Sequence, residues 1–286
     1  MAFISFKYDY AFRELFSLEN VRKQFLSVVL EIPLEEIISV KVVNPYLWKR
    51  FRRQKLGILD MNMEMQNGTK VNVEMQMRRQ KHWVKRQLFY LTKLYCGELR
   101  EGQDYAKLRK CVSISILDFN LTEHEENHSV YRLRDEQGRE LTDLLEVHIL
   151  ELVKKLKGEM ALNDWIRLFN AESEEDLKMI KVKNEGIVEA IELLKNLNLR
   201  KSLRYFHEER LKAIRDRRSE DEYVWDQGKI EGKIEDILQV LEELGSIPSD
   251  LRVRIMAEQD IENLNRWLKL AIRAESIEQF RDYIDE

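Results

Sequence analysis

The sequence predicts an α/β fold in which a mixed sheet is flanked by helices and followed by an all-helical C-terminal region. Three observations support this prediction. An Asn-Gly pair at Asn67-Gly68 separates two alternating runs, which is the strongest short hairpin signal in a sequence. Helical and β-branched segments alternate on both sides of this hairpin. Beyond about Leu144, apolar residues follow helical spacing almost without interruption.

The segments before the hairpin predict helix and then strand. Tyr8 to Leu30 has helical apolar spacing, either as one helix or as two helices broken near Glu19. Ile37 to Val43 is β-branched and apolar, which predicts a strand that ends at Asn44-Pro45. We expect this strand to join the sheet beside the hairpin.

The register of the hairpin follows from its side-chain pattern. A two-residue loop would set polar positions against apolar ones along the whole ribbon. A three-residue loop, with Gly68 in the left-handed conformation, separates the two faces and is therefore the register that we predict. Its apolar pairs are Leu59–Met75, Met61–Val73 and Met63–Val71, and its polar pairs are Asp60–Glu74, Asn62–Asn72 and Glu64–Lys70.

Two carboxylates face each other in this register, with Gln76 two residues beyond Glu74. Opposed Cβ atoms in such a pair lie roughly 5 Å apart, and like charges at that distance are destabilising unless a cation or a proton lies between them. A solvated polar face explains Glu64 opposite Lys70, but not an acid opposite an acid. We therefore predict that Asp60 and Glu74 hold Mg²⁺ against a phosphodiester.

Basic residues concentrate around the hairpin, although the whole chain carries 48 Lys and Arg against 52 Asp and Glu. From Trp48 to Arg86 there are 11 basic residues and 3 acidic ones. Basic patches beside a metal site suit a polyanionic backbone such as DNA, and an ordinary charged surface is the alternative interpretation. The candidate DNA-binding residues are Lys49, Arg50, Arg52, Arg53 and Lys55 before the hairpin, and Arg78, Arg79, Lys81 and Arg86 after it.

The segments after the hairpin predict a helix and another strand. Trp83 to Leu99 has helical spacing, and Val112 to Leu117 alternates as a strand. The apolar face expected to pack on the sheet consists of Val84, Leu88, Leu91, Tyr95 and Leu99.

The remaining chain predicts three parts: a core over residues 1–143, a helical extension over 144–220 and a small helical module over 221–286. Arg200 to Arg218 is expected to form a long solvated helix. Gly228 and Gly232 mark either a flexible hinge, which we favour, or a stripe where another helix approaches closely. Ser249, Asp260 and Ser276 are predicted N-caps of three short helices. We expect this module to serve association with a partner or with a second copy.

Other functional classes have little support. His124-Glu125-Glu126-Asn127-His128 spells the zinc-protease motif, but the polar stretch around it predicts a loop and not the helix that this chemistry requires. Cys96 and Cys111 are the only cysteines, which indicates neither a disulfide framework nor a zinc cluster and agrees with the cytoplasm. We find no signal peptide and no apolar span of the ~20 residues that cross a membrane.

Several strings, taken with the element order, resemble one known family. They are Asp9-Tyr10-Ala11-Phe12-Arg13, Gly57-Ile58-Leu59-Asp60, Asn72-Val73-Glu74-Met75-Gln76, Lys93-Leu94-Tyr95 with Arg86 and Tyr90 before it, Gly102 to Tyr105, and Ile114-Ser115-Ile116-Leu117-Asp118-Phe119. Over roughly residues 5 to 215 the chain resembles the restriction-endonuclease-like PD-(D/E)xK superfamily. The narrower resemblance is to PD-(D/E)xK transposases and recombination-promoting nucleases of the Rpn family.

This resemblance implies a site around Mg²⁺, with Mn²⁺ or Ca²⁺ as alternative ions. Asp60 and Glu74 would ligate the ion, and the backbone carbonyl of Met75 would add a ligand. The superfamily usually has Lys where this chain has Gln76, which can orient a water but supplies no charge.

Further residues enter through the same resemblance. Lys70, Arg13 or Lys93 would bring the missing positive charge. Asp9 is either a third acid beside the metal or a helix N-cap. Arg86 and Tyr90 would face the site, and core packing is at least as good an explanation for Tyr90.

Two functions follow from the sequence. The first is a metal-dependent DNA endonuclease that hydrolyses phosphodiester bonds, promotes recombination or serves a mobile element, and acts on the nucleoid in a bacterial cytoplasm. The alternative is a DNA-binding or protein-interaction module on a decayed nuclease fold that does not cleave.

Overall fold

The computed structural model describes residues 3–43, 46–47, 57–58, 60–97, 99, 102–158, 160–180 and 184–285. Contacts divide the chain into an N-terminal unit, Met1–His207, and a C-terminal unit, Glu208–Glu286. The divisions expected from the sequence lie elsewhere: position 143 falls inside a strand and position 220 inside a helix.

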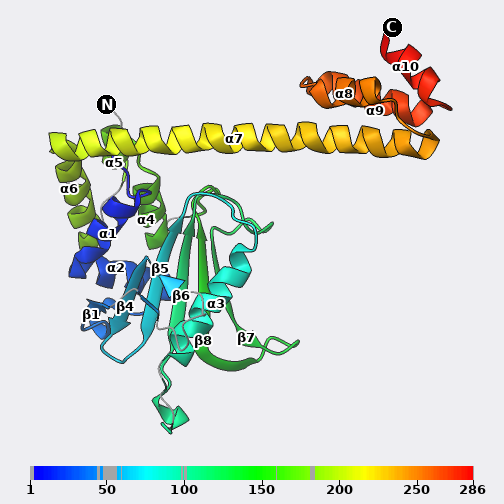
Figure 1. Ribbon diagram of the computed structural model, residues 1–286. Coiled ribbons are helices and arrows are strands. Elements are labelled where there is room, and N and C mark those ends of the chain that lie inside the picture. Colours follow the sequence, from blue (N-terminus) through cyan, green and yellow to red (C-terminus); the bar gives the residue numbers. More distant parts are fainter. Residues whose placement is uncertain are drawn as a thin grey trace. The chain divides into compact units, whose positions relative to one another are not determined.

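A mixed six-stranded sheet forms the centre of the N-terminal unit, which confirms the predicted α/β class (Figure 1). The strand order is β1-β4-β5-β6-β8-β7; the pairs β5–β6 and β6–β8 are parallel, and the other pairs are antiparallel. The strands are β1 (Val40–Val42), β4 (Met61–Met65), β5 (Lys70–Gln76), β6 (Cys111–Leu117), β7 (His128–Arg134) and β8 (Glu140–Glu151), with a separate pair of β2 (Tyr46–Leu47) and β3 (Gly57–Ile58).

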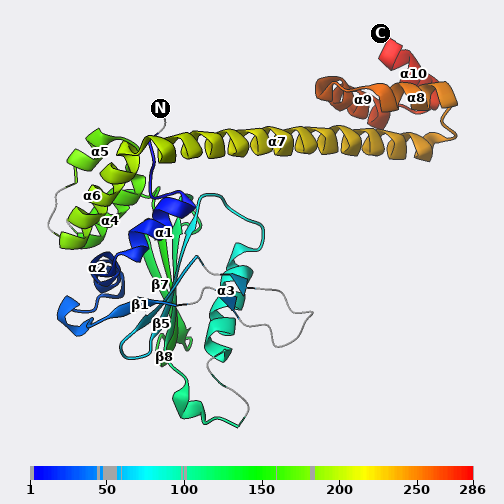
Figure 2. The same cartoon turned by 60° about the vertical axis from the view of Figure 1, so that its left-hand side comes forward.

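Helices cover both faces of this sheet (Figure 2). Helices α1 (Asp9–Ser17), α2 (Glu19–Leu30), α4 (Ala161–Asn170) and α6 (Glu185–Leu199) cover one face, and α3 (Trp83–Cys96) covers the other. The short helices are η1 (Leu34–Glu36), η2 (Tyr105–Lys107) and α5 (Glu174–Lys178). Edge-to-face aromatic contacts link the first helices to α4, with ring centroids 5.1 Å apart for Phe16 and Phe25 and 5.2 Å apart for Phe25 and Trp165.

The first helical segment is two helices, as the second of the two alternatives predicted. Helix α1 ends before Leu18, whose extended backbone separates it from α2. Asp9 is the first residue of α1 and not its N-cap, because the cap position belongs to Tyr8.

The β4–β5 hairpin has the predicted register and the predicted three-residue loop. Gly68 has a φ of 81°, in the left-handed region, and its N–H donates to the Met65 carbonyl at 2.9 Å. The Thr69 N–H donates to Asn67 Oδ1 at 2.9 Å, which further fixes the turn. The ladder pairs Met61 with Val73, Asn62 with Asn72, Met63 with Val71 and Glu64 with Lys70. Asp60 lies before the ladder, and Leu59 falls outside the described residues.

The expectation of helix from about Leu144 is wrong, because β8 continues to Glu151 and α4 begins only at Ala161. Glu146 and His148 resemble the polar face of an exposed helix in the sequence. In the structure both are buried, and ion pairs of Glu146 with Lys110 and Arg132 satisfy its carboxylate inside the fold. The local spacing of apolar residues therefore predicted a helix where the structure has a strand. It could not show Lys110 and Arg132, the distant residues that pair with Glu146.

The expected buried face of α3 is confirmed only in part, because Leu91 is buried and Tyr95 packs against the same apolar cluster, while the other members do not. Val84 and Leu88 are about half exposed, at 51% and 49%, and Leu99 lies beyond the helix end. The buried residues are Trp83, Gln87, Leu91 and Leu94. A polar contact made by Gln87 at the sheet turns the helix about its axis, so that one of its two apolar stripes faces outward.

The C-terminal unit begins within α7 (Lys201–Leu244) and continues with α8 (Ser249–Ala257), α9 (Ile261–Arg273) and α10 (Ile277–Asp285). The expected hinge at Gly228 and Gly232 is wrong, because both lie within the continuous helix α7. No described atom would come within 4 Å of an added Cβ at either position, so close approach of another helix stays a prediction. Asp260 caps α9 as predicted, and Ser276 Oγ accepts the Gln279 N–H. Ser249 is the first residue of α8 and not its cap.

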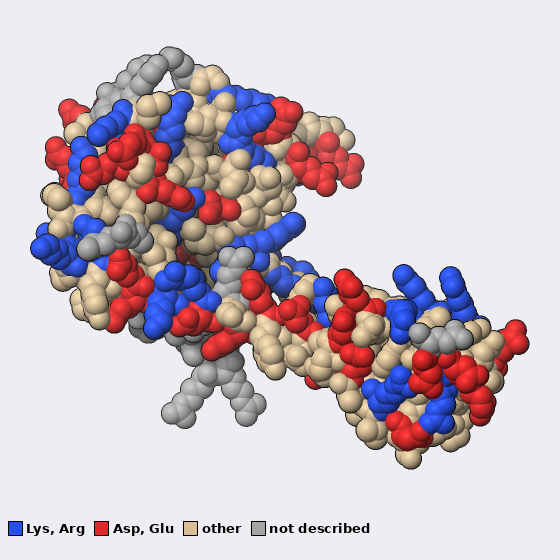
Figure 3. All heavy atoms as spheres, turned by 90° about the horizontal axis from the view of Figure 1, so that it is seen from above, with Lys and Arg blue, Asp and Glu red and all other residues tan. Residues whose placement is uncertain are grey.

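The surface in Figure 3 shows basic and acidic side chains interspersed, in keeping with a net charge of −4. Among the described residues, no helix combines the length and the apolar character needed to cross a membrane.

Replacing Gly68 with Ala is expected to lower the free energy of unfolding by about 1–2 kcal/mol, because a left-handed backbone costs a non-glycine residue about that much. The added Cβ would also lie 3.2 Å from Arg109 Cγ. Gly138→Ala separates the two causes: its φ is also left-handed, at 79°, but nothing lies within 4 Å of its Cβ position, so it should show the backbone cost alone. Urea unfolding measures both variants. A Gly68→Ala variant as stable as the wild type would contradict the assigned turn.

Candidate functional site

Asp60 and Glu74 are brought together where β4 begins and β5 approaches its end. Asp60 is in a bend before β4, so it is not strand-paired with Glu74 as the sequence suggested. The bend still turns its carboxylate towards β5, because the Met75 N–H donates to Asp60 Oδ2 at 3.4 Å. The two acids therefore lie near each other as predicted. The contact between the Met75 N–H and the Asp60 carboxylate takes the place of the expected strand pairing between Asp60 and Glu74.

The electrostatics of Asp60 reflect this arrangement. Burial raises its pKa, the neighbouring Glu74 raises it further, and Asp9 adds to the effect, giving a pKa of about 6. The Met75 N–H and Arg13 oppose this shift. Glu74 thus disfavours the charged form of Asp60, and this is the situation that a bound cation relieves.

Glu74 is 3% exposed and is held by amide donors from two elements. Asn72 Nδ2, from the same strand, donates to Glu74 Oε1 at 3.0 Å. Gln87 Nε2, from α3, donates to Glu74 Oε2 at 2.6 Å, and Arg86 Nη2 lies 3.9 Å from the same oxygen. A buried carboxylate without such donors would be very costly, so these contacts are what allow an acid at this position.

The sheet face towards α3 carries further polar groups beside this carboxylate. Ser115 is paired with Glu74 across β5 and β6, and it is fully buried. Ser115 Oγ and Asn72 Oδ1 are buried and have no hydrogen-bond partner among the described residues. Buried polar atoms of this kind normally have a partner or a bound water.

These groups fit a hydrated, oxygen-preferring cation. Mg²⁺ is usually held by one or two carboxylates and keeps several waters, which the unpartnered atoms of Asn72 and Ser115 would receive. The oxygens of Asp60 and Glu74 and the Met75 carbonyl are the available ligands. No group of three or more His, Cys, Asp or Glu residues suited to a metal occurs among the described residues, so this would be a two-carboxylate site.

Two of the other predicted residues lie next to Asp60. A cleft of about 510 Å³ is lined by Arg13 and Asp60 together with apolar residues of β1 and β4. Arg13 Nε lies 3.4 Å from Asp9 Oδ1, one helical turn earlier on α1. The structure thus places both residues within electrostatic reach of Asp60, and a metal-binding role for Asp9 stays a prediction.

The remaining predicted residues differ in position. Gln76 ends β5 on the same sheet face as Glu74, because side chains alternate along a strand. Lys70 is at the hairpin end of β5, four residues and roughly 13 Å from Glu74, which removes it from the site. Lys93 lies near the C-terminus of α3, with its Nζ 5.7 Å from the Phe89 ring centroid. Tyr90 packs partly buried against the apolar cluster under α3, as its alternative role predicted.

Only part of the predicted DNA-binding set is described. Arg78, Arg79 and Lys81 are exposed between β5 and α3, directly after the site strand. Arg86 points towards the site instead, since its Nη1 donates to Gln80 Oε1 at 2.6 Å and its Nη2 approaches Glu74. The earlier cluster, Lys49, Arg50, Arg52, Arg53 and Lys55, lies outside the described residues.

Sequence reasoning missed the residues that hold Glu74. Gln87 is the polar member of the buried face of α3, and Ser113 faces it from β6. A signal was available: Gln87 lies one turn from both Trp83 and Leu91, so a helix burying those residues must also bury an amide. The serines of the alternating β6 strand mark the matching sheet face.

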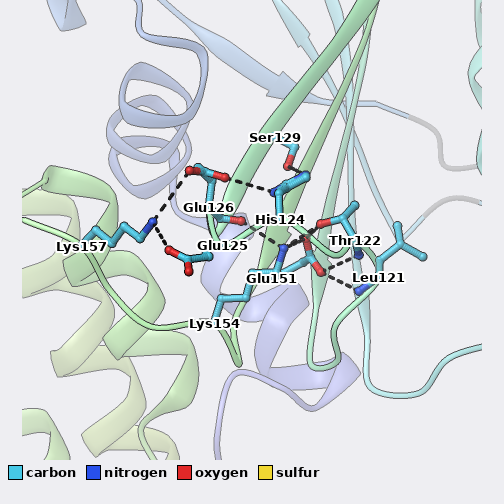
Figure 4. A network of polar contacts seen from close by, with 9 residues as sticks. All are labelled: Leu121, Thr122, His124, Glu125, Glu126, Ser129, Glu151, Lys154 and Lys157. Atoms are coloured by element: carbon cyan, nitrogen blue, oxygen red, sulfur yellow. Dashed lines mark hydrogen bonds and ion pairs between the residues drawn. The ribbon is translucent and has the colours of Figure 1, made fainter.

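The histidine motif does not form a zinc site. Its first four residues lie in an irregular loop and His128 begins β7; in the loop, His124 contacts Glu126 and Ser129 (Figure 4). His128 Nε2 instead lies 3.0 Å from His148 Nδ1, and burial together with His148 lowers the pKa of His128 to about 4.

A second network anchors the same loop to the sheet. Buried Glu151, at the end of β8, accepts hydrogen bonds from the Leu121 and Thr122 amides, the Thr122 hydroxyl and Lys154 Nζ (Figure 4). These hydrogen bonds to Glu151 give the polar loop a structural role.

The raised pKa of Asp60 predicts a stability change that depends on pH. Between pH 3.8, the ordinary pKa of an aspartate, and about pH 6, the folded metal-free protein keeps a proton that the unfolded chain has lost, so stability falls as pH rises through this range. Asp60→Asn removes this cost. It should be more stable than the wild type by roughly 1–3 kcal/mol at pH 7.5, and equally stable near pH 4.

Urea unfolding in EDTA at the two pH values measures this difference. Asp143→Asn is the control, since the Asp143 side chain is largely exposed. A difference that does not change with pH would show that Asp60 has an ordinary pKa.

Comparison with known proteins places the chain in a family. A family profile described as PD-(D/E)XK nuclease family transposase matches residues 6–223. No curated protein and no solved structure gives a significant match. The matched range includes α1, the hairpin with Asp60 and Glu74, α3 and the whole sheet. Because it also covers well over half of the sequence, the chain belongs to the PD-(D/E)XK nuclease family transposases.

Proposed function

We propose that the protein is a metal-dependent DNA endonuclease with its site at Asp60 and Glu74. The observation that carries this proposal is the pair of acids at the hairpin: Asp60 is partly buried and has a raised pKa, and Glu74 is buried and held by two amide donors. Family membership supports a nuclease or a link to mobile elements. Mg²⁺ is the proposed cofactor, with Mn²⁺ or Ca²⁺ as alternatives.

Each group has a chemical role in this proposal. A bound Mg²⁺ would lower the pKa of a coordinated water and stabilise the charge that develops on the phosphate. Asp60 and Glu74 supply carboxylate oxygens, and the Met75 carbonyl adds a neutral one. Gln76 can orient a water through its amide but cannot supply positive charge. Arg13, which lines the cleft beside Asp60, and Arg86, which lies 3.9 Å from Glu74, are candidate cations among the described residues.

DNA is the proposed substrate, held by exposed arginines and lysine after β5. Arg78, Arg79 and Lys81 follow the site strand directly, so a backbone that contacts them also approaches Glu74. We propose that cleavage promotes recombination or serves a mobile element, and that the protein acts on the nucleoid in the cytoplasm.

Association through the C-terminal helices stays a prediction. Exposed apolar side chains support it, because Val253 and Met256 lie three residues apart on α8 and both are mostly exposed. Residues at this spacing share one helix face. A second copy of the chain is the partner that we propose.

Supercoiled plasmid cleavage tests the nuclease. The wild type should nick or linearise the plasmid with Mg²⁺ or Mn²⁺ and not with EDTA, whereas Asp60→Ala should lose activity by at least about 100-fold, because the cation loses a charged ligand. Asp143→Ala, a surface acid on β8, should cleave like the wild type. Equal cleavage by Asp60→Ala and wild type in pure protein would overturn the assignment.

The second candidate is a DNA-binding module that does not cleave. Gln76 in place of a lysine is the observation that favours it, because the site then lacks the usual cation. This candidate predicts salt-sensitive binding with no products under any divalent metal.

Both candidates predict that the exposed arginines contact phosphates. Replacing Arg78 and Arg79 together with Ala should weaken DNA binding in a gel shift. It should also reduce the slope of log affinity against log salt. Each phosphate contact contributes about 0.9 to this slope, so the loss of two contacts should reduce it by up to about 1.8. The matched control replaces Arg134 and Arg139, which are exposed near the β7–β8 turn. An unchanged slope in the Arg78 and Arg79 variant would show that DNA binds elsewhere.

A further inference from the structure

We infer that Gln87 is a positioning residue for Glu74: its buried side-chain amide fixes the carboxylate in the orientation in which it meets the cation. This inference rests on the proposed function, and it assigns to α3 a role in the site that its spacing alone did not indicate. The short contact between α3 and β5 is the starting observation.

The contact joins two buried groups. Gln87 Nε2 lies 2.6 Å from Glu74 Oε2, with Gln87 2% exposed and Glu74 3% exposed. Asn72 Nδ2 holds the other oxygen, Oε1, at 3.0 Å. A carboxylate with a donor on each oxygen cannot rotate freely about its last torsion, so the two donors select one orientation.

A third residue determines which end of the Gln87 amide faces the acid. Ser113 Oγ, on β6, is 3.3 Å from Gln87 Oε1 and donates its hydroxyl proton to it. If the amide were reversed, its oxygen would face Glu74 Oε2 and two acceptors would meet. Ser113 therefore stabilises the orientation in which Gln87 donates to Glu74.

The chemical type of the donor also matters. An amide donates a hydrogen bond to the buried carboxylate without carrying a positive charge, so it does not occupy the place of a cation. A lysine or arginine at the same contact would compete with that cation for the acid. The guanidinium of Arg86 approaches the same oxygen, Glu74 Oε2, only to 3.9 Å. Each carboxylate oxygen has two lone pairs, so one remains available on each after the amide bonds.

Because of these hydrogen bonds, the entropy cost of ordering the Glu74 side chain arises during folding. The rotamer freedom of Glu74 is lost on folding and not on metal binding, so the cation binds a site that is already arranged. Removing the Gln87 amide should therefore weaken cation affinity even if Glu74 stays in place. A purely structural role predicts instead lower stability with unchanged affinity.

Isothermal titration of Mn²⁺ into the full chain, without DNA, separates these outcomes. Gln87→Leu keeps most of the side-chain volume but loses the amide, and it should raise the Mn²⁺ dissociation constant by about 10-fold, the lower end of the range for partners of metal ligands. Gln24→Leu is the matched control, because Gln24 is a buried glutamine on α2. Its dissociation constant should equal that of the wild type, and urea unfolding reports the stability of each variant.

A second variant covers the case in which Gln87→Leu fails to fold. Ser113→Ala leaves Gln87 in place but removes the hydroxyl that orients its amide, so it should raise the dissociation constant by about 3-fold. Wild-type affinity in a folded Gln87→Leu, or in Ser113→Ala if Gln87→Leu does not fold, would overturn the inference and leave the nuclease proposal intact. A wild type that binds no Mn²⁺ would overturn both.

Discussion

The register of the β4–β5 hairpin is the constraint on which the rest of the site depends. Gly68 adopts a left-handed backbone that closes a three-residue loop, and this loop determines which residues oppose one another along both strands. Because side chains alternate, a slip by one residue would exchange the two faces of a strand. Met63 and Val71 would then face polar surroundings, and Glu74 would enter the apolar core between the sheet and α2.

Burial of an acid inside the sheet requires donors that the hairpin alone does not supply. Asn72 provides one from the same strand, and α3 provides the other through Gln87. This requirement explains why α3 presents Gln87 and Leu91 to the sheet and leaves Val84 and Leu88 half exposed. The orientation of the helix is set by a polar contact as well as by apolar area.

In the proposed function, Asp60 and Glu74 represent a compromise between stability and cation binding. Burial, together with the neighbouring Glu74, raises the pKa of Asp60 in the metal-free protein. A divalent cation converts the same arrangement into a favourable one, since it is attracted to both. The repulsion between the two acids lowers the stability of the metal-free protein, and its relief would favour binding of a cation.

The sequence alone determined the parts of this protein that depend on local periodicity and turn chemistry. Asn67-Gly68 and the alternating runs around it gave the hairpin register, whereas the bend that turns Asp60 towards Met75 is seen only in the folded structure. Tertiary structure decided the features whose partners are distant in the chain. Residues 144–151 form a strand because Lys110 and Arg132 satisfy Glu146, and Gln87 faces inward because Glu74 needs a donor. A polar side chain appears solvent-facing in sequence, and only the folded arrangement shows the partner that makes its burial favourable.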